Sequence, residues 1–143
     1  MERGRRLEQE VLKILEENLK ITLHRSGLLL NTNFPVIGAS PDAITENFVV
    51  EVKCPVSLKS EKRYITKDNQ IGNKYFAQIQ LQMFMQNVKK GYFCMAKHDF
   101  ETSQNIIVIC VDYDEQFVME IINNAMNFWK QNIFPLLFNG VAK

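Results

Sequence analysis

Residues 38–55 read GASPDAITENFVVEVKCP, and the apolar run inside this stretch predicts a central β-strand. Side chains alternate between the two faces of a strand, so Glu51 and Lys53 are expected on one face and the neighbouring valines on the other. Burying a charged side chain costs several kcal/mol unless another group pairs with it. The strand therefore predicts either an ordinary Glu51–Lys53 salt bridge or a metal site completed by other parts of the chain.

The composition is that of one globular domain spanning residues 1–143, with 46% hydrophobic and 23% charged residues. The formal net charge is +1, so any nucleic-acid site has to come from a local cluster of basic side chains. The three cysteines, Cys54, Cys94 and Cys110, are odd in number and have no Cys-x-x-Cys spacing. This pattern argues against a disulfide framework, a zinc site or an iron–sulfur cluster, and favours buried free thiols in a reducing compartment.

The chain has no uninterrupted apolar run of about 18 residues, and its first residues, MERGRRLEQE, are charged. These features predict a soluble, intracellular protein without a membrane partner, located in the cytoplasm or in the nucleus depending on the host.

The order of elements predicts an α/β fold, with a central mixed β-sheet flanked by helices. Helices are expected at residues 2–20, 75–88 and 114–132. A strand pair is expected at 27–38, a central strand at 48–54, and two paired strands at 91–98 and 105–112, joined by a loop at 99–104. The last helix should begin at Asp112 or Asp114 as its N-cap, and its buried side is predicted to consist of Phe117, Ile121, Ile122, Ala125, Phe128 and Trp129.

Glu8 differs from the other glutamates of the first helix. At about 100° per residue, Leu12 lies near +40° and Leu15 near −20° from Glu8, which places this carboxylate in the middle of the apolar face. The other four glutamates of the helix lie about 80° or more away, toward water. Glu8 is therefore predicted to point into the protein.

Asp42, Glu51 and the backbone carbonyl of Val52 are hard oxygen ligands of the kind that suits Mg²⁺ or Mn²⁺. Lys53, on the same face as Glu51, could hold or deprotonate a water, or stabilise charge on a scissile phosphate. Taken singly, a Ser-Pro-Asp turn would account for Asp42, and an ion pair would account for Glu51 with Lys53. Their combination at this spacing favours a metal-dependent active site.

Four motifs carry a resemblance to a known family: GRRLE at 4–8, SPDA at 40–43, EVKCP at 51–55 and YFAQIQLQM at 75–83. In this order they resemble the lambda-exonuclease/YqaJ viral-recombinase branch of the PD-(D/E)xK nucleases, from residue 4 to about residue 137. The resemblance implies a restriction-endonuclease-like core and a Mg²⁺ cofactor, for which Mn²⁺ could substitute.

The resemblance also assigns roles to individual residues. It implies that Asp42, Glu51 and the Val52 carbonyl bind the metal, and that Lys53 activates or orients the attacking water. It adds Glu8 and Gln78 to the catalytic set. A buried structural role is the alternative for both. Gln80 turns about 160° away from Gln78 on the helical wheel.

Members of this family usually carry an upstream helical segment that grips the DNA end, and this segment is expected to be absent here. Ala43 also stands where the family often has glycine. DNA contacts are then predicted for a basic loop after the central strand, whose cations are Lys59, Lys62, Arg63, Lys67 and Lys74. An ordinary solvated loop is the alternative.

The resulting functional hypothesis is a metal-dependent DNA nuclease, an exonuclease that resects duplex ends in viral or mobile-element recombination or replication. The expected partners are double-stranded DNA with free ends, a single-strand annealing protein and further copies of the same chain. A structure-selective or nicking endonuclease and a non-catalytic nucleic-acid-binding module remain as alternatives.

Overall fold

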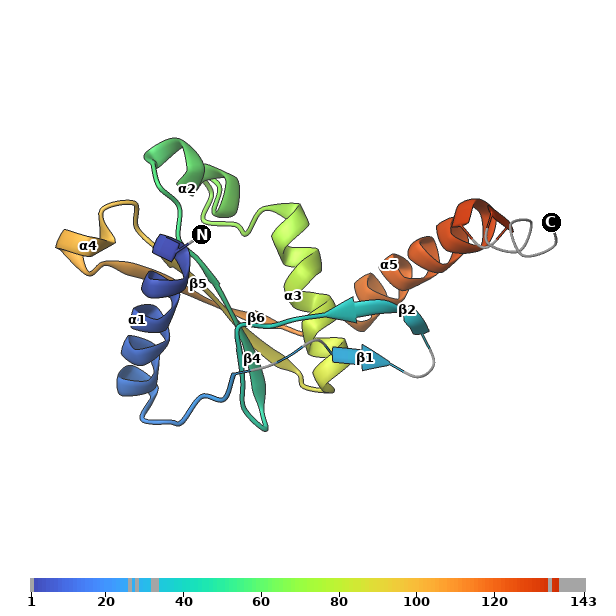
Figure 1. The fold of residues 1–143 in the computed structure, drawn as a ribbon, viewed down its shortest axis with the longest axis horizontal. Coiled ribbons are helices and arrows are strands. Elements are labelled where there is room, and N and C mark those ends of the chain that lie inside the picture. The colour runs from blue at the N-terminus through green and yellow to red at the C-terminus, as the bar shows by residue number, and fades with distance from the viewer. Residues whose placement is uncertain (1, 26, 28, 32–33, 134, 137–143) are drawn as a thin grey trace.

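The computed structural model describes residues 2–25, 27, 29–31, 34–133 and 135–136 (Figure 1). Its central sheet has the strand order β3–β4–β5–β6, in which β4 and β5 are parallel and the two outer pairings are antiparallel. The strand bounds are β3 Ala43–Ile44, β4 Phe48–Lys53, β5 Lys90–Ala96 and β6 Ile106–Asp112. The predicted mixed sheet is confirmed.

Helices cover both faces of this sheet. Figure 1 shows α1 (Glu2–Leu19) and α3 (Asn73–Gln86) on opposite sides of β4 and β5. Val50 and Val52 of β4 pack into the core beneath α1, with Leu7, Val11, Leu12 and Leu15. Val49, on the alternate face, packs into the core beneath α3, with Ile79 and Met83. Glu51 and Lys53 share the parity of Val49, so they belong to the α3 face.

The connection from β4 to β5 differs from the prediction. The polar stretch was expected to be a loop, but residues Leu58–Tyr64 form the helix α2. Its first turn is capped by Ser57, whose Oγ accepts a hydrogen bond of 3.1 Å from the Ser60 N–H. The sequence LKSEKRY has no apolar stripe at helical spacing, so periodicity gives no sign of this helix.

The close contact between α3 and β5 explains Gly91. A Cβ atom at this position would lie 3.0 Å from Ile79 Cδ1 and 3.3 Å from Val49 Cγ2. Glycine therefore lets the helix that carries Gln78 approach the sheet closely. α3 ends at Asn87, whose φ of 59° lies in the left-handed region that commonly terminates helices.

Two predicted pairings of strands are also observed. β1 (Leu29–Asn31) and β2 (Phe34–Ala39) form an antiparallel ribbon outside the main sheet. The second pair is β5 with β6, which are antiparallel. The connection between them, predicted as a loop, contains the single-turn helix α4 (Phe100–Ser103).

The last helix, α5 (Glu115–Phe128), begins as predicted, because Asp114 Oδ1 accepts a hydrogen bond of 3.0 Å from the Phe117 N–H. It continues into a short π-helical turn, η1 (Trp129–Ile133). Its buried side differs from the prediction. Of the predicted residues only Ile122 is buried, Val118 is buried although it was not predicted, and Ala125 and Phe128 are exposed, Phe128 to 60%. Figure 1 shows the reason, since the second half of α5 extends away from the sheet.

The cysteine prediction is correct only in part. The three thiols are free in the described chain, but Cys110 is exposed, Cys54 is half-buried and only Cys94 is buried. Burial raises the pKa of the Cys94 thiol to about 12 and that of Cys54 to about 11, so both remain protonated at neutral pH. Among the described helices, none combines the length and the apolar character needed to cross a membrane.

Candidate active site

Pairing of β3 with β4 brings Asp42, which directly precedes β3, next to the residues 51–53 at the end of β4. The Asp42 N–H donates to Val50 O at 2.9 Å, and Asp42 Oδ2 accepts a 2.7 Å hydrogen bond from the Val52 N–H. The N–H and C=O of one strand residue leave the strand on the same side, so the Val52 carbonyl is directed to the Asp42 side of β4. The turn at Ser-Pro-Asp thus places a carboxylate and a backbone carbonyl together.

Glu51 is a buried carboxylate, with 4% of its surface exposed, in the middle of the sheet. Its Oε1 accepts hydrogen bonds from Lys53 Nζ at 3.1 Å and from Gln78 Nε2 at 3.3 Å. Its Oε2 accepts one from Gln82 Nε2 at 2.8 Å. The charge is therefore compensated by one cation and two amides, as a buried carboxylate requires.

Lys53 and Gln78 complete a closed set of contacts with Glu51. Lys53 Nζ donates to Gln78 Oε1 at 3.2 Å as well as to Glu51. The Gln78 amide therefore accepts from the lysine through its oxygen and donates to the glutamate through its nitrogen. The structure brings these three predicted residues together.

Gln82 belongs to this set, although sequence reasoning did not single it out. Its side chain is buried, its Nε2 holds Glu51 Oε2, and within the described residues its Oε1 has no hydrogen-bond partner. The available signal was its spacing, because a residue four positions after Gln78 lies on the same helical face. Gln80 faces the other way and bridges Asp112 O and the Asp114 N–H, each at 2.9 Å.

Glu8 reaches the site from the α1 side of the sheet. It lines a surface pocket of about 250 Å³ together with Val52, Lys53 and Cys54. Its carboxylate forms an ion pair with Arg25, a partner that the sequence did not predict, and its side chain is 21% exposed. Glu8 thus borders the candidate site, where its carboxylate accepts a hydrogen bond from Arg25.

The electrostatics of Asp42 agree with a site for a cation. Burial and then the charge of Glu51 raise the pKa of Asp42 to about 7, and Glu8 adds to this effect, whereas the Val52 N–H and Lys53 oppose it. Two or three carboxylates that repel one another in this way would be relieved by a dication. The described residues contain no group of three or more His, Cys, Asp or Glu side chains suited to a metal. The donors that fit Mg²⁺ here are two carboxylates and one carbonyl.

The first 89 residues, which contain most of this site, match a known protein family. The sequence pattern of the YqaJ-like viral recombinase domain matches residues 1–89, which is more than half of the chain. The chain belongs to the YqaJ-like viral recombinase domain family. The matched segment includes Glu8, Asp42, Glu51, Lys53 and the glutamines of α3, so the predicted resemblance is confirmed. No curated protein matches the sequence.

Solved structures share the fold of this family member. An alkaline exonuclease (LHK-Exo) from Laribacter hongkongensis is 19% identical with a TM-score of 0.81, and the match covers 99% of this chain and 74% of that one. The same exonuclease in complex with dAMP matches equally well. A phage-related exonuclease from Haemophilus somnus 129PT is 15% identical with a TM-score of 0.67, over 92% of this chain and 71% of that one. These likenesses confirm the predicted fold class.

The predicted DNA-binding cations are all exposed, but they do not lie on one loop. Lys59, Lys62 and Arg63 belong to α2, Lys67 follows that helix, and Lys74 is in the first turn of α3. The glutamate within this stretch, Glu61, is buried. The basic surface therefore presents fewer acidic side chains than the sequence suggests.

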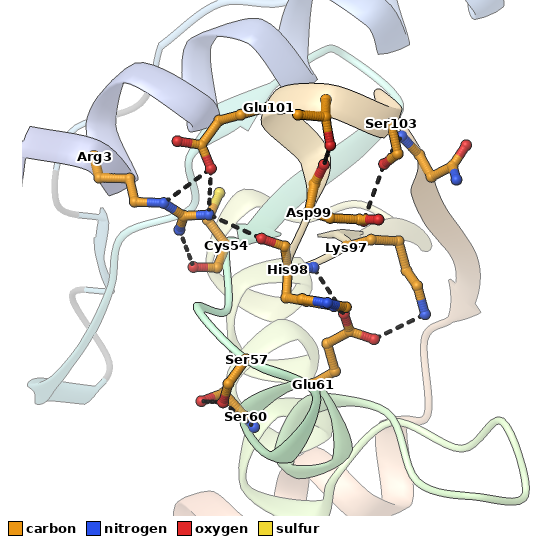
Figure 2. A network of polar contacts seen from close by, with 12 residues as sticks. Arg3, Cys54, Ser57, Ser60, Glu61, Lys97, His98, Asp99, Glu101 and Ser103 are labelled. Atoms are coloured by element: carbon orange, nitrogen blue, oxygen red, sulfur yellow. Dashed lines mark hydrogen bonds and ion pairs between the residues drawn. The ribbon is translucent and has the colours of Figure 1, made fainter.

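Glu61 anchors α2 to the end of β5. Figure 2 shows its carboxylate between Lys97 and His98: Oε1 accepts from Lys97 Nζ at 2.8 Å, and Oε2 accepts from the His98 N–H at 2.7 Å and contacts His98 Nδ1 at 2.6 Å. Burial alone would raise the pKa of Glu61, but these hydrogen bonds lower it to about 2. The helix that carries three of the predicted DNA-binding cations is thus held against the sheet by a buried, charged contact.

Arg3 ties the beginning of α1 to the same region. Its guanidinium donates to Cys54 O at 3.4 Å and to His98 O at 3.3 Å, and it pairs with Glu101 at 2.8 Å (Figure 2). The arginine therefore joins the ends of the two parallel strands to the helix that carries Glu8.

Proposed function

We propose that this protein is a metal-dependent deoxyribonuclease that hydrolyses phosphodiester bonds. We further infer that it is an exonuclease that resects duplex ends in viral or mobile-element recombination or replication. The observation that carries the proposal is the joint placement of Asp42, Glu51, Lys53 and Gln78 at the end of a buried strand. Membership of the YqaJ-like viral recombinase domain family and structural likeness to two exonucleases support it.

The proposed cofactor is Mg²⁺, with Mn²⁺ as a substitute. Asp42, Glu51 and the carbonyl of Val52 would hold the ion, which would supply Lewis-acid polarisation of the scissile phosphate. The chain itself prepares these ligands. The Val52 N–H orients Asp42, and Gln78 and Gln82 hold the two oxygens of Glu51.

Lys53 supplies the positive charge beside the reacting phosphate. Its ammonium group has three N–H donors, of which two are directed to Glu51 and Gln78. The remaining donor can orient the attacking water or stabilise charge that develops on a phosphate oxygen. A preorganised donor of this kind acts most strongly where water is excluded, and the Lys53 side chain is 18% exposed.

The DNA would run past the exposed cations of α2 and the start of α3. Basic side chains of this kind contact phosphates and so position the DNA, and Glu61 holds the helix in place. Resection of one strand would leave single-stranded tails, the substrate of a single-strand annealing protein. Assembly into a homo-oligomer belongs to the same proposal.

The experiment that tests the function compares end-labelled linear duplex DNA with closed circular DNA, in Mg²⁺ and in EDTA. We expect degradation of the linear duplex in Mg²⁺ only, with the closed circle intact. Asp42→Asn serves as the matched control, since it keeps an acceptor for the Val52 N–H and removes one charge of the metal site. It should lose cleavage and bind Mn²⁺ more weakly in calorimetry.

Other outcomes would redirect the assignment. Efficient cutting of the closed circle would favour an endonuclease. DNA binding without cleavage in either metal would favour a non-catalytic module. Unchanged Mn²⁺ affinity in Asp42→Asn would remove this carboxylate from the metal site.

A further inference from the structure

Two tyrosine rings lie beside the ammonium group of Lys53. Lys53 Nζ lies 5.0 Å from the centroid of the Tyr75 ring and 5.9 Å from that of Tyr64. Both distances are within the range of a cation–π contact, in which the negative face of the ring attracts the cation. The lysine is therefore surrounded by Glu51, Gln78 and two aromatic faces.

The two rings come from different helices and support each other. Tyr64 is the last residue of α2, and Tyr75 is in the first turn of α3. Their centroids are 4.7 Å apart with an interplanar angle of 56°, and the Tyr75 ring also lies 6.5 Å from Phe93 in the core. Tyr75 is thus fixed on two sides by aromatic contacts.

We propose that Tyr75, supported by Tyr64, is a positioning residue that holds the Lys53 ammonium toward Glu51 and Gln78. Its kinetic consequence rests on the proposed nuclease function, whereas the contact itself does not.

Hydrogen bonds to Glu51 and Gln78 alone do not fix the orientation of the Lys53 ammonium group. This ammonium is a compact, strongly hydrated charge at the end of a flexible four-carbon chain, so two hydrogen bonds leave it several orientations. A ring face gives the cation a third favourable side without adding an acceptor that would compete for its N–H groups. The remaining donor thus stays available to the substrate.

Replacement of the ring separates this role from packing. Tyr75→Leu removes the aromatic face, and we expect kcat to fall about tenfold, the scale of a partly desolvated cation–π contact, with KM and Mn²⁺ affinity little changed. Tyr75→Phe keeps the ring and should retain most of the wild-type kcat. Tyr64→Leu should have a smaller effect than Tyr75→Leu, because its ring is farther from the cation.

A second series changes the charge of the ring and not its shape. Mono-, di- and trifluorinated phenylalanine at position 75 withdraw electron density from the ring face in steps. We expect kcat to fall with each added fluorine. A kcat that is independent of fluorination would overturn the proposal, because packing alone would then explain the tyrosine.

The chain offers a matched control in Tyr113, whose ring lies 4.5 Å from Lys89 Nζ and which also packs against the hydrophobic core. Tyr113→Leu removes the same kind of contact at a lysine outside the candidate site, and kcat should be unchanged. An equal loss in Tyr113→Leu and Tyr75→Leu would also overturn the proposal.

A measurement without DNA separates this inference from the nuclease assignment. In the NMR spectrum of the wild type, ring currents should shift the ε-methylene resonance of Lys53 upfield. Tyr75→Leu should move this resonance toward its usual position, and Tyr113→Leu should leave it in place. An unshifted Lys53 resonance in the wild type would refute the contact, whereas a shifted resonance in a protein that cleaves no DNA would refute only the proposed function.

Discussion

Lys53 gives the most direct test at the scale of a single residue. Its ammonium is bonded to Glu51 and Gln78, so Lys53→Ala should lower kcat by roughly two orders of magnitude, the effect of losing a preorganised electrostatic partner. Metal affinity should stay the same or rise slightly, because a nearby positive charge is removed. Lys90→Ala, which breaks the exposed 3.1 Å pair with Asp112, is the control and should keep full activity. More than a tenth of the wild-type rate in Lys53→Ala would show a structural lysine.

Gln80 and Gln82 are two positions apart on α3, but only substitution of Gln82 should lower kcat. Gln82→Leu removes the donor to the buried Glu51 Oε2 together with an unpaired buried oxygen, so kcat should fall about tenfold and the free energy of unfolding by about 1–3 kcal/mol. Gln80→Leu breaks two hydrogen bonds to the backbone and should cost about 2–4 kcal/mol of unfolding free energy with kcat unchanged. Denaturant titration and initial rates measure the two quantities. A Gln82→Leu enzyme with normal kcat would remove this residue from the site.

At the scale of the element, substitutions can test the role of Glu8 on α1. Glu8 borders the pocket that holds Lys53 and also pairs with Arg25. If its carboxylate acts at the site, Glu8→Gln should lower the cleavage rate about tenfold or more while the fold is preserved, and Arg25→Gln should leave the rate nearly unchanged. If Glu8 serves only in the ion pair with Arg25, Glu8→Gln and Arg25→Gln should change the cleavage rate and the melting temperature to the same extent. Single-turnover rates and melting temperatures distinguish these results.

The basic residues of α2 are also tested at this scale, as a group. Glu61 holds the helix that carries them against the end of β5. Each phosphate contact contributes nearly one unit to the log–log dependence of DNA affinity on salt. Replacing Lys62 and Arg63 together by alanine should therefore flatten the slope by nearly two and slow degradation without changing metal affinity. The control is the pair Lys89→Ala and Lys90→Ala on the far end of β5. A slope identical to that of the wild type would place the DNA elsewhere on the molecule.

The whole molecule should show an unusual pH dependence of stability when metal is removed. The pKa of Asp42 is raised from 3.8 to about 7, so the folded state keeps a proton that the unfolded state releases, and stability falls as pH rises through this interval. Asp42→Asn should abolish this fall and be more stable than the wild type near pH 8 in EDTA, by about 2 kcal/mol after allowance for solvent screening. Thermal melting between pH 4.5 and 8 measures it. Equal pH profiles of the two proteins would contradict the prediction.

Glu61 acts in the opposite direction and in another pH range. Its pKa is lowered from 4.5 to about 2, so its contribution is present above pH 4.5 and is lost as pH falls toward 2. The two carboxyl groups together favour greatest stability of the metal-free fold between pH 4 and 5. Glu61→Gln should flatten the acid side of the profile and leave the neutral side as in the wild type.

Several properties of this protein were determined by the sequence alone. Alternation along β4 places Glu51 and Lys53 on one face, and the helical period places Glu8 on the inner side of α1, because both patterns depend only on local geometry. Motif order identified the family, and Asp114 marked the start of α5. These features need no knowledge of which elements are neighbours.

The tertiary structure decided what the site contains beyond its motif. Helical spacing puts Gln82 on the face of Gln78, but its contact with Glu51 depends on how α3 packs on the sheet. Arg25, which follows α1, and the tyrosines of α2 and α3 also come to the site through tertiary packing, and no local pattern specifies their contacts across the chain. The same reason explains α2, whose sequence has no apolar stripe and which is held by the buried carboxylate of Glu61. It also explains the exposure of Phe128, because α5 extends beyond the sheet that would cover it. Periodicity states which face of an element is apolar, but only the assembled fold states what lies against that face.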